Sequence, residues 1–193
     1  AGIVEVQHWR FVPGQRGAYE DCLRRHRNDA RWIAFIDIDE FLFSPTGNPL
    51  PEILRGFDTH PGVTVNWRIY GTSGFEHPPD GLVTENYLWR GPDDNIANRI
   101  VKSIVYPRRA LGWMSPHYFR LQGNPVAEDH RPVESVGYVA PRVVADGLVG
   151  VREPTAELLR INHYYARSEE EFRRKAARPV ATTGMIETGR LPI

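Results

Sequence analysis

The fold of this chain is constrained most by one segment, residues 31–43, with the sequence RWIAFIDIDEFLF. Its first half is a nearly unbroken apolar run with aromatic and β-branched residues, a pattern typical of a strand covered on both faces. We therefore expect a buried strand over residues 31–37. The run ends in three acidic residues, Asp37, Asp39 and Glu40. Ionised carboxylates are costly to bury without a partner, so the pattern predicts a neutralising group, and a divalent cation is the leading candidate.

The Asp-x-Asp pattern predicts how the first two acids are arranged. Strand side chains alternate, so Asp37 and Asp39 would lie on the same side and repel each other unless a cation sits between them. Oxygen ligands suit Mg²⁺ or Mn²⁺, and α/β sheets bind ligands at the carboxyl ends of their strands. Alternatively, both acids cap the next turn and face solvent. A phosphatase with an Asp nucleophile has a similar pattern, but it expects Thr or Val where this chain has Phe41.

Composition narrows the class of protein. The chain has 193 residues, 41% of them hydrophobic and 25% charged, which predicts one ordinary globular core. The formal net charge is zero, so no overall field favours nucleic acid as a partner. The single cysteine, Cys22, excludes a disulfide framework and a cysteine-based zinc site. No apolar run is long enough to span a membrane, and we expect a cytoplasmic domain.

The remaining pattern predicts an α/β fold with a mixed sheet flanked by helices. We expect further strands at residues 2–9, 62–70, 81–89, 99–106 and 157–165. Helices are expected over residues 14–30, 51–56 and 168–178. Ser168 and Glu171 form a capping box at the start of the last helix. Residues 107–135 have no clear pattern, and residues 137–151 suggest a β-hairpin.

Several blocks along the chain resemble glycosyltransferase family 92 and its bacterial relatives, a branch of the enzymes with the GT-A fold. The blocks occur in the order of that family over residues 18–179: AYEDCLRRHRNDARWIAFIDIDEFLF, YGTSGFEHPPDGLVTENYLWR, KSIVYP, a His-x-Phe at His117, and INHYYARSEEEFRRKAARP. Several blocks in one order are more specific than any single motif.

The resemblance implies a metal-dependent transferase that uses a nucleotide sugar, with a UDP-sugar as the implied donor. Asp37 and Asp39 match the metal-binding Asp-x-Asp of the family, with Asp39 bridging metal and diphosphate and Asp37 nearer the ribose or the water shell. His163 matches a third metal ligand, and an imidazole ligand favours Mn²⁺ over Mg²⁺. The alternative for His163 is a core histidine that is hydrogen-bonded to backbone.

The same resemblance suggests which residues carry the transfer. An inverting enzyme needs a carboxylate as general base, and we rank Glu85 first and Glu76 second. Cationic side chains would share the charge of the leaving diphosphate, and the candidates are Lys102, Lys175, Arg99 and Arg178. The resemblance places His117 on the acceptor side. Aromatic residues that belong either to a sugar-stacking surface or to the core are Trp67, Tyr70, Phe75 and Trp89.

One part of the family pattern is absent. The opening block, which holds the nucleobase in enzymes of this kind, does not occur, and the chain starts at the strand that follows it. We therefore expect residues 1–193 to be a single, partial glycosyltransferase domain that lacks the base-binding segment. The expected partners are a nucleotide sugar and a glycan acceptor, with no nucleic acid and no membrane span. A non-catalytic carbohydrate-binding remnant remains an alternative.

Overall fold

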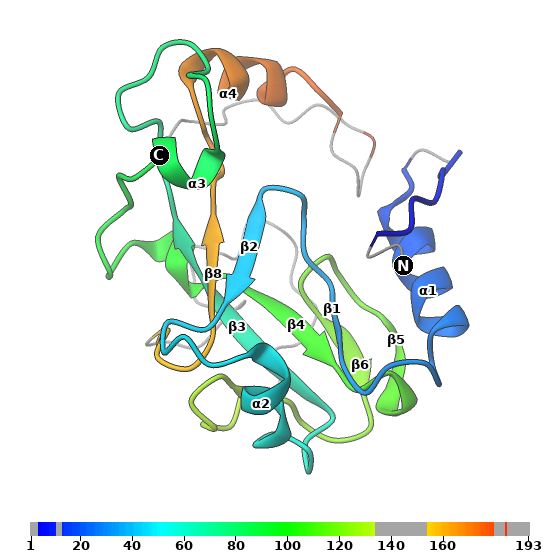
Figure 1. Cartoon of the computed structure of the whole chain (residues 1–193). Helices are drawn as coiled ribbons and strands as arrows, with labels where there is room; N and C mark the ends of the chain where they lie inside the picture. Colours follow the sequence, from blue (N-terminus) through cyan, green and yellow to red (C-terminus); the bar gives the residue numbers. More distant parts are fainter. Residues whose placement is uncertain (1–3, 11–12, 134–153, 180–183, 185–193) are drawn as a thin grey trace.

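The computed structural model describes residues 4–10, 13–133, 154–179 and 184, and shows a curled mixed sheet with helices on its flanks (Figure 1). The pairing order along the sheet is β1-β4-β3-β8-β2, and β7 pairs with β3 outside this path. The bounds of these strands are β1 Ile33–Ala34, β2 Glu40–Phe43, β3 Gly62–Ile69, β4 Val101–Val105, β7 Val126–Ala127 and β8 Arg160–His163. A separate hairpin consists of β5, Ala110–Trp113, and β6, Phe119–Leu121.

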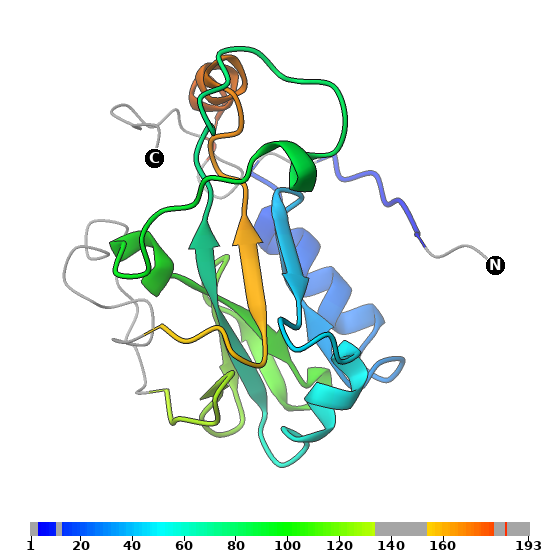
Figure 2. The same ribbon diagram turned by 60° about the vertical axis from the view of Figure 1, so that its left-hand side comes forward.

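Strand β3 explains why the sheet curls. Its residues 62–66 pair with β4 in antiparallel register, whereas residues 67–69 pair with β8 in parallel register. The two halves of one strand thus have different neighbours, and β1 and β2 lie at opposite ends of the pairing order. Only residues 35–39 connect β1 to β2, so the sheet must bend to bring these two edges together (Figure 2).

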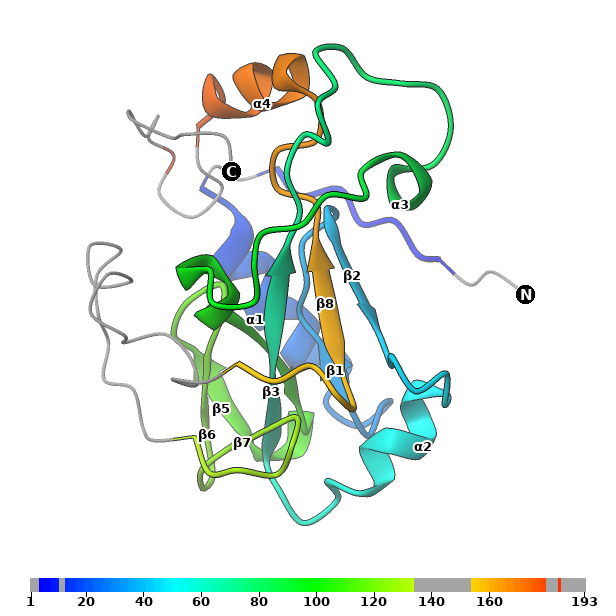
Figure 3. The ribbon, with the colours of Figure 1, turned by 90° about the vertical axis from the view of Figure 1, so that its left-hand side faces the viewer.

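The helices lie on the flanks and at one end of the sheet (Figure 3). They are α1 Gln15–Arg25, α2 Leu50–Arg55, α3 Val83–Asn86 and α4 Glu169–Ala176, with 3₁₀ turns at Ile96–Arg99 and Pro107–Arg109. Helix α4 has the predicted capping box: Ser168 Oγ accepts the Glu171 N–H, and the Glu171 side chain accepts the Ser168 N–H. Among the described residues, no helix is long and apolar enough to cross a membrane.

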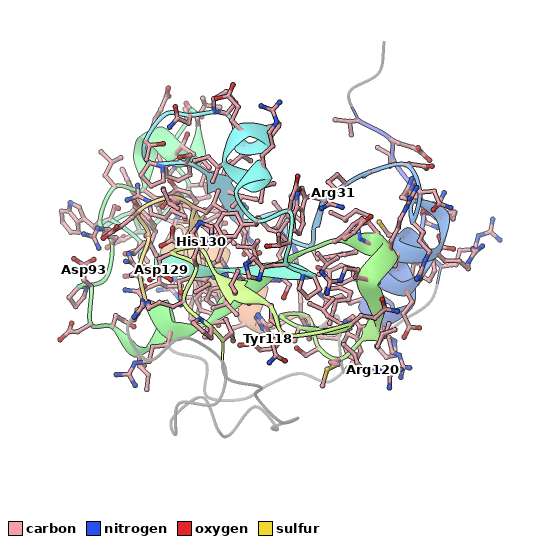
Figure 4. All side chains as sticks on the ribbon, turned by 90° about the horizontal axis from the view of Figure 1, so that it is seen from below. Arg31, Asp93, Tyr118, Arg120, Asp129 and His130 are labelled. Carbon is pink, nitrogen blue, oxygen red and sulfur yellow. The ribbon has the colours of Figure 1, made fainter. Side chains whose placement is uncertain are left out.

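The core lies on both faces of β3, all eight residues of which are buried. The largest cluster packs α2 against the sheet and contains Leu54, Phe57, Val63, Val65, Trp67, Ile104, Val126, Leu159 and Ile161. A second cluster joins α1 to the β5–β6 hairpin through Leu23, Phe35 and Phe119. At the lower end of the molecule, the ring of His130 stacks on Phe57, with ring centroids 4.1 Å apart (Figure 4).

The predicted strands near the middle and the end of the chain are confirmed, but two others are wrong. Residues 4–9 form no strand, and the segment predicted as a strand at residues 81–89 contains α3 instead. Its backbone is satisfied locally, because the N–H groups of Glu85 and Asn86 both donate to the carbonyl of Leu82. Leu82 is 62% exposed, whereas Tyr87 is buried in a small cluster of tyrosines, so the apolar pattern of this segment does not mark one face of a strand. The hairpin predicted at residues 137–151 lies outside the described residues.

The predicted strand over residues 31–37 is much shorter than expected. Only Ile33 and Ala34 pair with β4, and after Phe35 the chain leaves the sheet. Helix α1 is also shorter than the prediction over residues 14–30, because it ends at Arg25. Asp37 and Asp39 therefore do not follow a strand directly but lie in the connection between β1 and β2, and Glu40 begins β2.

Candidate functional site

Three chain segments meet side by side at the upper end of the sheet (Figure 1). The Tyr70 N–H, just after β3, donates to the carbonyl of His163 at 2.9 Å. The Tyr164 N–H, just after β8, donates to the carbonyl of Asp39 at 2.9 Å. The carboxyl ends of β3 and β8 therefore lie next to the start of β2, which is the edge where α/β sheets bind ligands.

The acidic residues form a tight turn at this edge. The Glu40 N–H donates to the carbonyl of Asp37 at 3.0 Å, and the Asp37 N–H donates to Glu40 Oε2 at 2.9 Å. Ile38 stands at the tip of the turn and is 94% exposed. The turn sends the side chains of Asp37 and Asp39 to different cationic partners.

Asp37, whose own side chain is 40% exposed, belongs to an ion cluster around Lys102, the second residue of β4. Lys102 Nζ lies 2.8 Å from Asp37 Oδ2 and 3.4 Å from Glu40 Oε2. The side chains of Lys102 and Glu40 are 1% and 0% exposed. Burial raises the pKa of Glu40 to about 7, although the charge of Lys102 opposes the rise. This cluster fixes the turn, because the Glu40 carboxylate accepts the backbone N–H of Asp37 and also pairs with Lys102.

The raised pKa of Glu40 predicts a pH dependence of stability. The folded protein binds the Glu40 proton more tightly than the unfolded chain does, in which the pKa of Glu40 is near 4.5. Protonation of Glu40 therefore stabilises the fold fully below pH 4.5, and this stabilisation is lost as the pH rises through about 7. Urea unfolding in EDTA at about pH 4.5 and about pH 8 should show wild type losing free energy of unfolding relative to Glu40→Gln. If the free energy of unfolding changed equally in wild type and in Glu40→Gln between these two pH values, the prediction would be wrong.

Asp39 belongs to a second cluster, which faces α4. Lys175 Nζ lies 2.6 Å from Asp39 Oδ2, and His163 Nε2 lies 3.6 Å from Asp39 Oδ1. Burial alone would raise the pKa of Asp39, but the hydrogen bonds and charges of His163 and Lys175 hold it below its ordinary value. Burial lowers the pKa of His163. Lys175 also donates to the Tyr165 carbonyl at 3.1 Å and lies 4.2 Å from the centre of that ring.

The predicted metal ligands are brought together only in part. Asp39 and His163 face each other, whereas Asp37 points to Lys102. In the described part of the chain, no group of three or more His, Cys, Asp or Glu side chains could hold a metal ion. The Nδ1 atom of His163 is buried without a hydrogen-bond partner. One carboxylate and one imidazole fit a site that substrate oxygens and water complete, which is a usual arrangement for divalent ions on phosphates.

A pocket of about 350 Å³ opens beside Asp39, between the acidic turn and α4. It is lined by Ile38, Asp39, Tyr165, Ala166, Arg167, Glu171, Arg174, Lys175 and Arg178. Cationic side chains outnumber acidic ones in this lining, so the pocket suits an anion. Asp39, Lys175 and Arg178 were predicted site residues, and the structure brings them together.

Sequence reasoning missed two of the arginines in this pocket. Arg174 and Arg178 are four residues apart, a spacing that places side chains on one helix face, so this signal was present in the sequence. Arg167 had no such signal, and it precedes the capping box with a φ of +53°. A residue with a side chain pays a strain penalty in this left-handed region, and such strain is concentrated at functional sites. Arg167 also contacts Glu171 at 3.4 Å.

The predicted general bases lie outside the pocket lining. Glu85 is exposed in the first turn of α3. Glu76 is exposed in the preceding loop, and its carbonyl accepts the Glu170 N–H at 3.0 Å. Both segments lie at the same end of the sheet as the pocket (Figure 3). The choice of base therefore stays a prediction.

The aromatic candidates divide between core and surface. Trp67 and Tyr70 are buried, whereas Trp89 is 69% exposed. His117 packs edge-on against Trp67, and its Nδ1 lies 2.9 Å from the carbonyl of Val101. Burial lowers the pKa of His117 to about 4. Trp67 and Tyr70 thus pack in the interior, and His117 and Phe75 are half-buried. Of these candidates, Trp89 alone is mostly open to solvent.

Comparison with known proteins gives consistent matches. The profile of glycosyltransferase family 92 matches residues 1–139. A family 92 protein of Ricinus communis is 28% identical over 182 residues, which cover 90% of this chain and 28% of that protein. One from Oryza sativa subsp. japonica is 32% identical over 104 residues, 51% of this chain and 17% of that protein. A galactan β-1,4-galactosyltransferase of Arabidopsis thaliana is 36% identical over 72 residues, 34% of this chain and 14% of that protein.

Proposed function

Since this chain belongs to glycosyltransferase family 92, we propose that it forms the diphosphate-binding part of an inverting glycosyltransferase. The donor is a nucleotide sugar, most simply a UDP-sugar, and the acceptor is a hydroxyl of a glycan. Relatives named galactan β-1,4-galactosyltransferase support a glycan acceptor. The chain spans 28% of the length of the Ricinus communis relative.

The observation that carries this proposal is the cationic pocket beside Asp39. A leaving diphosphate needs positive partners that are already in place, because preorganised charges stabilise it without further rearrangement. Lys175 and three arginines, Arg167, Arg174 and Arg178, line the pocket and can donate charge-assisted hydrogen bonds to phosphate oxygens. Lys175 is paired with Asp39, and this contact helps to hold the pKa of Asp39 below its ordinary value.

Asp39 and His163 would hold the divalent ion, Mn²⁺ or Mg²⁺, at the edge of this pocket. When bound, the ion acts as a Lewis acid on the diphosphate. Asp37 has a different task in this proposal, since its pairing with Lys102 sets the shape of the turn. Glu85 remains our first candidate for the general base and Glu76 the second, on the family resemblance.

The test is stabilisation of the protein by UDP in the presence of Mn²⁺, measured as the thermal midpoint of the complete natural protein. A ligand that binds only the folded state must raise this midpoint. We expect Lys175→Met to weaken UDP binding by about tenfold or more, because a charge-assisted contact is lost. The matched control is Arg173→Met, since Arg173 is 71% exposed and absent from the pocket lining.

Two results would contradict the proposal. If UDP and Mn²⁺ fail to stabilise the wild-type protein, the assignment of the donor site is wrong and a non-catalytic binding domain becomes the better explanation. If Lys175→Met and Arg173→Met bind UDP equally well, the pocket beside α4 does not hold the diphosphate.

A further inference from the structure

Trp89 is an exposed aromatic residue on a rigid support. Its side chain is 69% exposed, and it alone among the tryptophans, all of which lie in described segments, is largely open to solvent. The backbone N–H of Trp89 donates to Ser73 Oγ at 2.9 Å, and the backbone carbonyl of Trp89 accepts the Gly71 N–H at 3.0 Å. The backbone below the indole is therefore held from both sides.

The turn under the indole contains one strained residue, Ser73, next to a glycine that adopts the same region without strain. Ser73 and Gly74 have φ values of +51° and +81°, so two consecutive residues lie in the left-handed region. A Cβ placed on Gly74 would lie 3.7 Å from Trp89 Cζ3, which shows that one edge of the indole rests on the bare glycine. Strain of this kind persists only where surrounding contacts enforce it. Here the turn supports an indole ring whose remaining surface is exposed to solvent.

The position of Trp89 relative to the pocket follows from backbone pairing. The next residue, Arg90, bridges to Tyr70 at the end of β3. Tyr70 in turn donates to the last carbonyl of β8, and the residue after β8 donates to the carbonyl of Asp39. Neighbouring strands are about 4.8 Å apart, so three such spacings place this segment about 14 Å from the Asp39 backbone.

A second connection ties this segment to the pocket. Tyr87, two residues before Trp89, donates its hydroxyl hydrogen bond to Glu171 Oε2 at 2.8 Å. Glu171 lines the pocket. The loop that carries Gly74 is also bound to α4, because the Glu169 N–H donates to the carbonyl of Phe75 at 3.1 Å. Hydrogen bonds thus connect the segment that carries Trp89 to α4 and to the lining of the cationic pocket.

We propose that the exposed face of Trp89 stacks on a hexopyranose ring of the glycan acceptor. The apolar face of a sugar ring matches the flat apolar surface of an indole. An acceptor chain bound this way would have one unit on Trp89 and extend along the sheet edge toward Asp39. This inference rests on the proposed transferase function for the direction of the chain, while the stacking contact itself can be tested without catalysis.

The test compares binding of a defined probe, β-1,4-linked galactotetraose, to variants of the complete natural protein by isothermal titration calorimetry. We expect Trp89→Ala to weaken binding by roughly tenfold and Trp89→Phe to retain most of it, because an aromatic face remains. The matched control is Leu82→Ala, since Leu82 is 62% exposed on the same segment and should leave binding unchanged. UDP binding and the thermal midpoint should be the same in all of these proteins.

Each other outcome would overturn the inference. Equal affinity of wild type and Trp89→Ala for the oligosaccharide would do so, as would no binding to wild type. A change of oligomeric state in Trp89→Ala, seen by light scattering, would instead identify the indole as a protein contact. Failure of the donor site would appear separately, as loss of UDP binding in wild type while the oligosaccharide still binds.

Discussion

Replacing Asp39 with Asn is expected to remove the Mn²⁺-dependent stabilisation by UDP and to lower the transfer rate by at least about 100-fold. Asp39 is the carboxylate that faces both His163 and Lys175, and its lowered pKa keeps it ionised at working pH. The amide keeps the shape but loses the charge that a cation needs. Thermal shift with UDP and MnCl₂, together with a transfer assay on the complete protein, would measure both effects.

The fold should survive this substitution. Lys175 keeps its contacts with Tyr165 and is 34% exposed, so water can solvate the ammonium that loses its partner. Asp94→Asn is the matched control, because Asp94 is an exposed loop carboxylate outside the pocket lining. Should Asp39→Asn bind UDP with Mn²⁺ as tightly as the control does, Asp39 is not a ligand of the metal–diphosphate complex.

Replacing Glu128 with Ala is expected to lower the free energy of unfolding by about 3–5 kcal/mol. Glu128 is 0% exposed, and its carboxylate accepts three backbone N–H groups: those of Glu157 at 3.2 Å, Leu158 at 2.6 Å and Leu159 at 2.9 Å. Alanine leaves these three N–H groups without their acceptor, and that of Leu159 is buried. Because such a loss is a large part of total stability, the variant is expected to unfold at a much lower urea concentration.

Two variants make this prediction specific. Glu128→Gln keeps the volume and one carbonyl oxygen, so it should be destabilised less than the alanine variant. Glu157→Ala removes only an exposed side chain while its backbone N–H remains, and it should be nearly neutral. If Glu128→Ala unfolded at the same urea concentration as Glu157→Ala, the carboxylate would not anchor the segment that leads into β8.

The sequence by itself determined the elements whose signals are local. Residues 62–70 were predicted as a strand from their β-branched and aromatic residues, and β3 occupies Gly62–Ile69. Helix α4 was predicted from Ser168 and Glu171, because a capping box satisfies its own backbone within four residues. The acids at 37–40 and His163 were singled out as site candidates from the acidic cluster and the motif order, and Asp39 and His163 lie together in the structure.

The tertiary structure alone decided which charges meet. Lys102 pairs with Asp37 across 65 positions of sequence, and Lys175 pairs with Asp39 across 136. Pairing of β1 with β4 and of β2 with β8 brings these residues together, and periodicity carries no information on contacts between distant residues. The same reason applies to the segment at 81–89, whose apolar pattern predicted a strand. In the described part of the chain it pairs with no strand: Val83–Asn86 form α3, and the backbone of Trp89 bonds to the loop at 71–73, which leaves the indole on the surface.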